Sequence, residues 1–253
     1  MRWLDHGWRL SVTAAAFAFI FFGGGVLAVT LLPVLALVPG HRRDRPQWVI
    51  HRSFRLYIEL LQRCGLIRLE TEGLEKLDRA EGRLVVANHP SLLDVVLLMA
   101  LIPRVQCIVK HELWAHPFLG PLMRRAGYIR NDLEPELLVE ACQSALDSGT
   151  CLIVFPEGTR TIPGCLPRFR RGFANLATLT GAPVQPVLIT CVPPYLVKGE
   201  PWWRIPAEKP LFRLAVDEYV DAKTYSYSAH RSLAARQLTR FLEAYYAEKL
   251  SNA

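Results

Sequence analysis

Short apolar runs alternate with longer amphipathic segments from Gly82 to the end of the chain. The short runs are rich in Val, Ile and Leu and end at polar or glycine residues, a pattern typical of buried strands. They predict strands at residues 83–87, 105–110, 126–129, 151–155, 184–192 and 211–216. The longer segments predict helices at residues 94–102, 134–149, 172–180 and 228–250. Strands that alternate with helices indicate an α/β fold, and we expect a mixed β-sheet flanked by helices.

A long apolar segment lies near the start of the sequence. Residues 10–40 contain no charged side chain, although Arg9 precedes them and His41 and Arg42 follow them. About 20 apolar residues cross the hydrocarbon core of a bilayer, whereas the apolar region of a signal peptide has only about 7–15. We therefore expect an N-terminal apolar membrane-anchoring segment rather than a cleaved leader.

Two paths through the membrane fit this segment. Gly23, Gly24, Gly25 and Pro33 weaken a continuous helix, so a re-entrant hairpin of two shorter helices is an alternative to a single span. In the single-span case, more arginines follow the segment than precede it, which places the body on the cytoplasmic side. The expected location is a bacterial-type inner membrane, with the main domain facing the cytoplasm.

The segment that follows the anchor is amphipathic. Apolar side chains recur at helical spacing in this segment, at Trp48, Phe54, Ile58 and Leu61. Arginines lie among them. A helix along the membrane surface and a helix packed on the main domain both fit this pattern. The expected organisation is an anchor at residues 1–45, an amphipathic linker helix at 46–69 and a main domain at 70–253.

The chain is basic, with a net charge of +7 and an isoelectric point of about 9.3. Arginines beside the apolar segment would attract anionic headgroups, each contributing about 1 kcal/mol. Nucleic-acid binding fits poorly, because the positive charge is not interleaved with stacking aromatic residues in a recognisable module. The six cysteines form no C-x-x-C pair and no metal-like spacing with histidine, which indicates buried thiols in a reducing compartment.

A polar cluster interrupts two apolar runs in VVANHPSLLDVV at residues 85–96. His89 follows a predicted strand, and open α/β sheets place their ligand crevices at the carboxyl ends of strands. Asp94 falls in the first turn of the next helix, where it can reach His89. A hydrogen bond between them would fix the tautomer and make the other ring nitrogen a better proton acceptor. The structural alternative is that Asn88 or Ser91 caps the helix, while Asp94 merely favours its dipole.

A second polar turn, FPEGTR at residues 155–160, follows another predicted strand in the same way. Glu157 supplies a carboxylate, Gly158 shapes the turn, and Arg160 offers a planar fork that can hold phosphate or carboxylate through two hydrogen bonds. Three arginines then precede a predicted helix start, which is a natural anion site: Arg168, Arg170 and Arg171. A solvated basic surface is the alternative for this run.

Together these segments resemble successive blocks of the glycerolipid acyltransferase family, of the 1-acyl-sn-glycerol-3-phosphate (lysophosphatidic acid) acyltransferase type. The resemblance covers residues 70–195. Its blocks are NHPSLLD at 88–94, KHELWAHPFLGPLMRRAGYI at 110–129, FPEGTR at 155–160 and APVQPV at 182–187.

The resemblance implies that this chain transfers an acyl group from an acyl thioester to a lipid hydroxyl, as an acyltransferase of phospholipid biosynthesis. It implies that His89 is the general base and that Asp94 orients it. It further implies that the acceptor's glycerol-phosphate part is bound by the second turn: Glu157, Gly158, Thr159 and Arg160.

The chain departs from the family in the second block. The family commonly has an arginine six residues after a glycine, and this arginine binds the acceptor phosphate; counted from Gly127, the position holds Leu133. Either Arg130 or one of the later arginines, such as Arg171, takes this role, or the acceptor lacks the usual phosphomonoester.

The implied partners are acyl-CoA or acyl carrier protein as donor, a lysophospholipid as acceptor, and the bilayer itself. The expected acceptor is 1-acyl-glycerol-3-phosphate, which gives phosphatidic acid. The same chemistry on an aminolipid or glycolipid is one alternative, and a catalytically silent lipid-binding membrane protein is another. This chemistry needs no metal and no cofactor, and the sequence has no G-x-S-x-G motif for a nucleophilic serine.

Overall fold

The computed structural model describes residues 2–26, 30, 44–78, 81–117, 119–226 and 231–251. Its centre is a seven-stranded sheet with the order β1-β7-β6-β2-β5-β3-β4. The strands are β1 (Arg68–Glu72), β2 (Leu84–Ala87), β3 (Val105–Val109), β4 (Ile129–Arg130), β5 (Cys151–Val154), β6 (Val184–Val192) and β7 (Leu211–Val216). Neighbouring strands are parallel except β6 and β7, so the sheet is mixed, as the sequence predicts.

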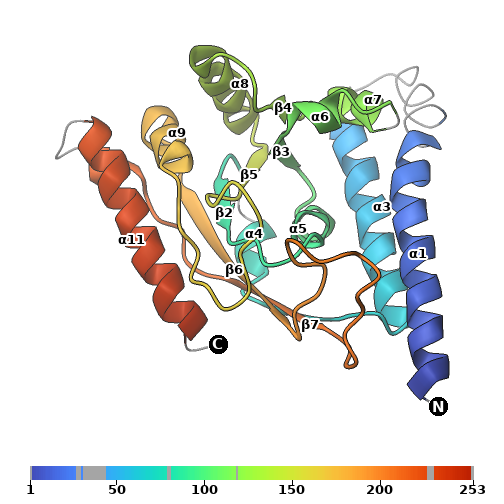
Figure 1. Ribbon diagram of the computed structural model, residues 1–253. Coiled ribbons are helices and arrows are strands. Elements are labelled where there is room, and N and C mark those ends of the chain that lie inside the picture. Colours follow the sequence, from blue (N-terminus) through green and yellow to red (C-terminus); the bar gives the residue numbers. More distant parts are fainter. Residues whose placement is uncertain are drawn as a thin grey trace.

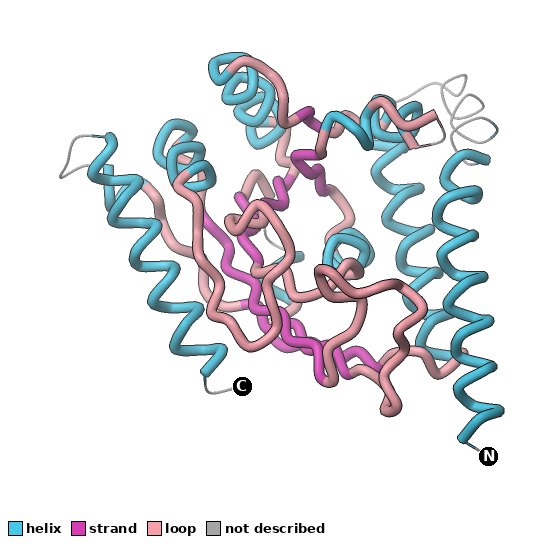
Figure 2. Tube along the Cα trace, viewed as in Figure 1, coloured by secondary structure: helices cyan, strands magenta, loops and turns pink. Residues whose placement is uncertain are grey.

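Helices cover both faces of this sheet (Figures 1 and 2). The longer ones are α1 (Arg2–Val26), α3 (Asp44–Arg63), α5 (Asp94–Leu101), α8 (Pro135–Asp147), α9 (Gly172–Thr180) and α11 (Arg231–Ser251). The short ones are α4 (Glu75–Asp78), α6 (His111–Trp114), α7 (Gly120–Arg125) and α10 (Lys223–Ser226). In Figure 1, α8, α9 and α11 lie on one side of the sheet, and α1 and α3 lie on the other.

Two hydrophobic cores result, because side chains alternate between the two faces of a strand. In β2, Val85 and Ala87 join the core that contains α3 and α5. Leu84 and Val86 join the core beneath α8, α9 and α11. All four are fully buried, so β2 reads as a continuous apolar run rather than an alternating one, as expected for a central strand covered on both sides.

Helix α1 is tied to the rest of the molecule by polar contacts as well as by apolar packing. Arg9 is buried, and its guanidinium donates to the carbonyls of Pro206, Ala207 and Glu208. The hydroxyls of Thr13 and Tyr195 lie 3.1 Å apart. These contacts join the start of the chain to the segment between β6 and β7.

Most predicted elements are present, and the differences have local causes. Strand β4 has two residues where the sequence predicts four at 126–129, because Gly127 turns the chain with a φ of 75°. Strand β1 is not predicted from the sequence, since its alternation of charged residues in RLETE lacks an apolar run. It crosses the expected domain boundary between residues 69 and 70, and it pairs in parallel with β7.

The expected anchor falls partly outside the described residues. Helix α1 covers its first part up to Val26, whereas residues 27–29 and 31–43, which include Pro33, Arg42 and Arg43, lie outside them. Within the ranges that the structure describes, no helix combines the length and apolar character needed to cross a bilayer. The anchoring function of this segment stays a prediction.

Tyr246 on α11 connects the central strands. Its side chain is fully buried, and its hydroxyl donates to the Val86 carbonyl of β2 at 2.7 Å and accepts from the Val187 amide of β6 at 3.1 Å. One side-chain oxygen therefore satisfies backbone groups of two neighbouring strands.

Replacing this tyrosine by phenylalanine should remove both bonds and leave buried backbone groups without a partner. We expect Tyr246→Phe to lower the free energy of unfolding by about 1–3 kcal/mol, measured by urea denaturation. Tyr225→Phe is the matched control, because no hydrogen bond of the Tyr225 hydroxyl joins it to the described residues. An equal loss in both variants would contradict the bridging role.

Candidate active site

Four neighbouring parallel strands end at the same edge of the sheet, in the order β6-β2-β5-β3. The polar turn with His89 follows β2, and the turn at residues 157–160 follows β5. Lys110 follows β3, and the loop that reaches Lys198 follows β6. The sequence expectation that the first two turns meet at one edge is therefore met by the strand pairing itself.

His89 and Asp94 are directly hydrogen bonded. Nδ1 of His89 lies 2.8 Å from Oδ2 of Asp94, which also accepts the amide of Ser91 at 2.7 Å. An ionised carboxylate only accepts hydrogen bonds, so Nδ1 carries the proton and Nε2 is left with a lone pair. The His89 ring stacks on Phe155 with centroids 4.2 Å apart, which fixes its orientation further. This is the geometry of an oriented general base.

The structural alternative for this turn is only partly met. The side chain of Ser91 accepts the amide of Leu93 at 3.3 Å, but no side chain caps the start of α5. Asp94 is fully buried, and its carboxylate serves His89.

Burial makes Asp94 a weaker acid than an exposed aspartate. Loss of hydration raises its pKa to about 6, although the hydrogen bond from His89 opposes that increase. Its Oδ1 has no hydrogen-bond partner among the described residues. A carboxylate that is buried, paired with histidine and only partly satisfied is typical of a functional site rather than of a core.

The backbone of His89 is held from both sides by the neighbouring turn. Its amide donates to Oε1 of Glu157 at 2.9 Å, and its carbonyl accepts the amide of Thr161 at 2.7 Å. The Thr161 hydroxyl donates to the same Oε1 at 2.8 Å. Burial raises the pKa of Glu157 above its ordinary value. Glu157 thus positions the histidine, while its predicted contact with the acceptor stays a prediction.

Arg160 links the turn to the loop after β6. Its Nη1 donates to the carbonyls of Leu196 at 2.8 Å and Val197 at 3.0 Å. Arg160 also lines the cavity beside His89, together with Gly158 and Thr159. Gly158 has a φ of 69°, a conformation that favours glycine.

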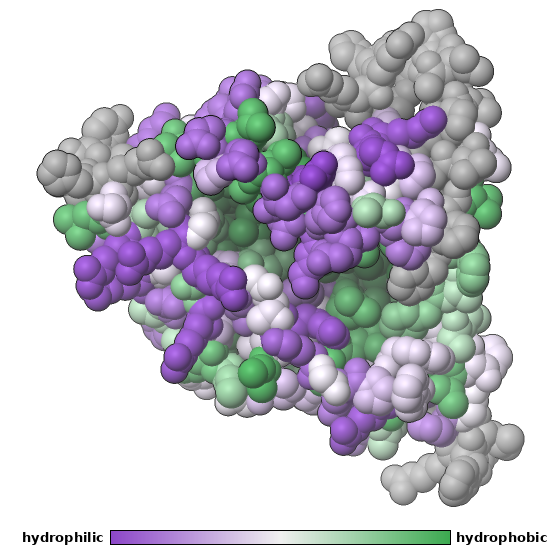
Figure 3. Space-filling view, turned by 45° about the horizontal axis from the view of Figure 1, so that its top comes forward, coloured by the Kyte–Doolittle hydropathy of each residue, from purple (hydrophilic) through white to green (hydrophobic). Residues whose placement is uncertain are grey.

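These residues line a cavity of about 800 Å³. Its walls are mostly apolar and come from α1, α3, α5, α7 and the ends of β3 and β5; they include Phe19, Ile20, Ile50, Phe54, Tyr57, Val95, Met99, Leu119, Leu122 and Ile153. The polar groups in its lining include His89, Thr159, Arg160, Lys110, Asn131 and Lys198. Figure 3 shows apolar surface at the bottom of hollows that hydrophilic residues surround. A cavity of this kind fits an aliphatic chain with a polar end.

The two arginines predicted for the acceptor phosphate lie elsewhere. Arg130 on β4 makes a bidentate pair with Asp132, at 2.8 and 2.6 Å, and does not line the cavity. Arg171 lies at the N-terminal end of α9 and does not line it either. Leu133 packs against the core beneath α8 and α9. The structure thus brings His89, Asp94, Gly158, Thr159 and Arg160 together, and leaves Arg130 and Arg171 outside this group.

Sequence reasoning missed Lys110 and Lys198 as cavity residues. Lys110 stands at the head of the KHEL segment and follows a strand, so the strand-end rule that selected His89 would have found it. Lys198 lies six residues beyond the end of β6, in a Pro- and Trp-rich loop whose path has no local signature.

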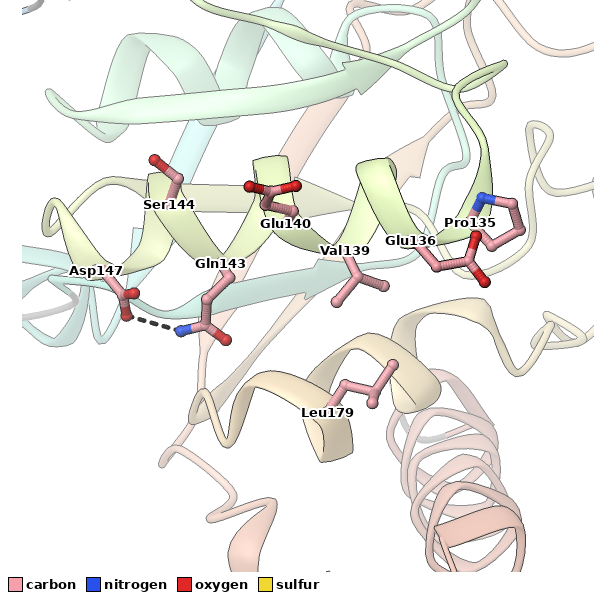
Figure 4. A pocket seen from close by; sticks show the side chains of 8 residues that line it. All are labelled: Pro135, Glu136, Val139, Glu140, Gln143, Ser144, Asp147 and Leu179. Carbon is pink, nitrogen blue, oxygen red and sulfur yellow. Dashed lines mark hydrogen bonds between the residues drawn. The ribbon is translucent and has the colours of Figure 1, made fainter.

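A second hollow lies between α8 and α9 (Figure 4). It is lined by Pro135, Glu136, Val139, Glu140, Gln143, Ser144, Asp147 and Leu179. It contains neither a histidine nor a cation, and none of the motif residues reaches it, so it takes no part in the site around His89. Across the residues that the structure describes, no three His, Cys, Asp or Glu side chains gather as a metal site requires.

Comparison with known proteins agrees with this geometry. The sequence profile of the family described as Acyltransferase matches residues 68–190, which contain both polar turns. Residues 68–190 thus match the acyltransferase family, as their motifs predict.

Individual relatives carry more specific names. The 1-acyl-sn-glycerol-3-phosphate acyltransferase alpha of Homo sapiens is 30% identical over 192 residues, which is 73% of this chain and 66% of that protein. The 1-acyl-sn-glycerol-3-phosphate acyltransferase of Cocos nucifera is 35% identical over 111 residues, 42% of this chain and 36% of that protein. This chain thus spans less than two thirds of the length of either.

A solved structure is similar over nearly the whole chain. It is the crystal structure of the 1-acyl-sn-glycerophosphate (LPA) acyltransferase from Thermotoga maritima, with a TM-score of 0.74 and 23% sequence identity. The similarity covers 98% of this chain and 97% of that one. At this identity the comparison establishes the α/β fold.

The raised pKa of Asp94 predicts how stability depends on pH. Between about pH 4 and 6 the folded state binds the proton of Asp94 more tightly than the unfolded state does, so the free energy of unfolding decreases as pH rises through this range. Relative to Asp94→Asn, which has no such proton, the wild type should lose about 2 kcal/mol between pH 4 and pH 7. Urea titrations of both proteins at several pH values measure this difference; a constant difference would contradict the burial argument.

Proposed function

We propose that this chain is a membrane-associated acyltransferase that acylates the free hydroxyl of a lysophospholipid. The observation that carries the proposal is an Asp94-oriented His89 at the polar end of an apolar cavity. An acyl thioester is the donor, and 1-acyl-glycerol-3-phosphate is the acceptor that gives phosphatidic acid. The names of the relatives support this choice of acceptor.

The reaction follows from the protonation states of the pair. Nε2 of His89 takes the proton of the acceptor hydroxyl as its oxygen attacks the thioester carbonyl, and Asp94 stabilises the imidazolium that forms. The tetrahedral oxyanion collapses, the carbon–sulfur bond breaks, and the imidazolium returns its proton to the departing thiolate. Proton transfer by such a base contributes about 10²–10⁴-fold to the rate.

Each wall of the cavity has a part in this scheme. The apolar residues of α1, α3 and α5 enclose an acyl chain and keep water from the thioester. The turn at residues 158–160 holds the glycerol-phosphate end of the acceptor, and Glu157 keeps the His89 backbone in place through its amide. Acyl-CoA and acyl carrier protein are both compatible with this arrangement as donors.

Replacing either member of the catalytic pair should abolish most of the activity. We expect Asp94→Asn and His89→Ala each to lower kcat by about 10³–10⁴-fold, with the fold retained in circular dichroism spectra. Wild-type kcat/KM should fall about tenfold per pH unit below pH 6, because protonated Asp94 no longer stabilises the imidazolium. His6→Gln, on the exposed surface of α1, is the control. Activity that survives in both catalytic variants would overturn the mechanism.

The acceptor is identified with purified protein, labelled acyl-CoA and a panel of acceptors. Lysophosphatidate should be turned over in preference to monoacylglycerol, a lyso-aminolipid and a lyso-glycolipid. Turnover of another acceptor without turnover of lysophosphatidate would favour the alternative acceptor class. No acyl transfer to any acceptor, together with binding of lipid, would favour a silent lipid-binding protein.

Membrane association is the second part of the proposal. The outward face of α3 interleaves exposed apolar residues, Trp48, Leu56 and Leu60, with Arg52, Arg55 and Arg63. Exposed apolar residues of α1 continue this surface, and both helices line the cavity. This combination suits the boundary between headgroups and acyl chains of an anionic bilayer. We place the body of the protein on the cytoplasmic side of a bacterial-type inner membrane.

Charge placed on this face should weaken membrane binding. We expect Leu56→Glu with Leu60→Glu to reduce cosedimentation with vesicles that contain anionic phospholipid by at least about tenfold, because each carboxylate opposes burial in the interface. Leu137→Glu is the matched control, since Leu137 is equally exposed but lies on α8 across the sheet. Equal losses in both proteins would contradict the assigned face.

A further inference from the structure

The cavity lacks the arginine that its family carries six residues after the glycine of the second block. Leu133 occupies that position; it is partly buried and packs against a hydrophobic core. Arg130 is neutralised by Asp132. A phosphate at the polar end of the cavity must therefore find its positive charges among other residues. Among the residues that the structure describes, the Lys and Arg side chains that line the cavity are Lys110, Arg160 and Lys198.

Lys198 reaches the cavity because β6 runs parallel to β2. The loop after β6 therefore emerges at the same edge of the sheet as the turn with His89. Two turns of the site hold this loop in place. Arg160 donates to the Leu196 and Val197 carbonyls, and the amide of Leu92 donates to the Leu196 carbonyl at 3.1 Å.

The backbone of this loop has an unusual conformation. Leu196 has a φ of 54°, in the left-handed region that residues other than glycine rarely adopt. Its side chain is buried, and its carbonyl accepts one bond from Arg160 and one from the amide of Leu92. Such a conformation persists only where the surroundings determine it, and it occurs preferentially at functional sites. Lys198 is the next residue after Leu196 and Val197, whose carbonyls Arg160 holds, so the fixed backbone also fixes the position from which Lys198 extends.

The charge of Lys198 is available for a ligand. No carboxylate pairs with Lys198 within the described part of the chain, and the nearby Glu200 is paired with Arg204 at 2.9 Å. Lys198 is exposed and contributes to the lining of a cavity whose walls are mostly apolar. Lysine binds phosphate as a compact point charge with three donors, and it complements the planar fork of Arg160.

We propose that Lys198 binds the phosphate of the acceptor and thereby selects an anionic lysophospholipid, with Arg160 both binding that phosphate and positioning Lys198. This inference rests on the proposed acyltransferase function. Lys198 supplies the positive charge that the family arginine would supply at position 133, where this chain has a leucine. The negatively charged phosphate of the acceptor is then bound by a residue that follows β6 rather than by one that follows β4.

The test compares acceptors that differ only in the phosphate. Steady-state kinetics with acyl-CoA are measured on lysophosphatidate and on monoacylglycerol, for the wild type, Lys198→Met and Lys198→Arg. Lys198→Met should raise KM for lysophosphatidate about 10- to 100-fold and leave the kinetics with monoacylglycerol within about twofold. Lys198→Arg should restore most of the affinity. Arg213→Gln, in an exposed pair with Glu70 on the distant edge of the sheet, controls for loss of positive charge.

Acyl-CoA also carries phosphates, so its KM is measured in the same variants. An increase confined to the KM of acyl-CoA would overturn the proposal and assign Lys198 to the donor. An increase in KM for lysophosphatidate in Lys110→Met but not in Lys198→Met would overturn it in favour of Lys110.

A double-mutant cycle tests the link to Arg160. Because Arg160 acts partly through the loop, the losses in Arg160→Met and Lys198→Met should not add in the double variant. Strict additivity would overturn the positioning role. A wild type that does not acylate lysophosphatidate would overturn the proposed function and this inference together, whereas an unchanged KM in Lys198→Met with an active wild type would overturn this inference alone.

Discussion

The carboxylate of Glu157 holds the two polar turns in one arrangement, and the site depends on that contact. A single oxygen accepts the amide of His89 and the hydroxyl of Thr161, while the amide of Thr161 returns a bond to the His89 carbonyl. Parallel pairing of β2 with β5 brings the turns to the same edge, but strand pairing alone leaves a loop residue free to rotate. Hydrogen bonds to both backbone groups of His89 remove that freedom. Because the carboxylate is buried, water competes only weakly with it for these donors.

The buried pair of His89 and Asp94 is costly for the fold. Asp94 is completely buried with one oxygen unpaired among the described residues, and loss of hydration moves its pKa toward neutrality. A core residue selected for stability alone would not be a carboxylate in this place. The same burial strengthens its interaction with a charged imidazole, since the local dielectric is low. Stability is thus exchanged for an electrostatic environment that favours proton transfer.

Sequence reasoning reached the fold and the contact between His89 and Asp94 because both depend on local patterns. The strand ends near residues 87 and 155 follow from apolar runs that stop at Asn88 and at Pro156, and the sheet rule then locates His89 and Arg160 together. The placement of Arg130 and Arg171 depended on side-chain partners and loop paths. Asp132 lies two residues from Arg130 and captures it, a contact that periodicity does not reveal. The path to Lys198 requires knowledge of what holds Leu196, which is a residue distant in sequence.

The buried guanidinium of Arg9 gives α1 a part beyond that of a tether. The helix rises 1.5 Å per residue, so Gly23 lies about 21 Å along the axis from Arg9. Arg9 is clamped to the carbonyls before β7, and the far end of the same helix, with Phe19, Ile20 and Gly23, forms a wall of the cavity. Such a rod transmits any tilt at one end to the other. The depth of the apolar cavity is therefore set jointly by the helix and by the segment before β7 that holds Arg9.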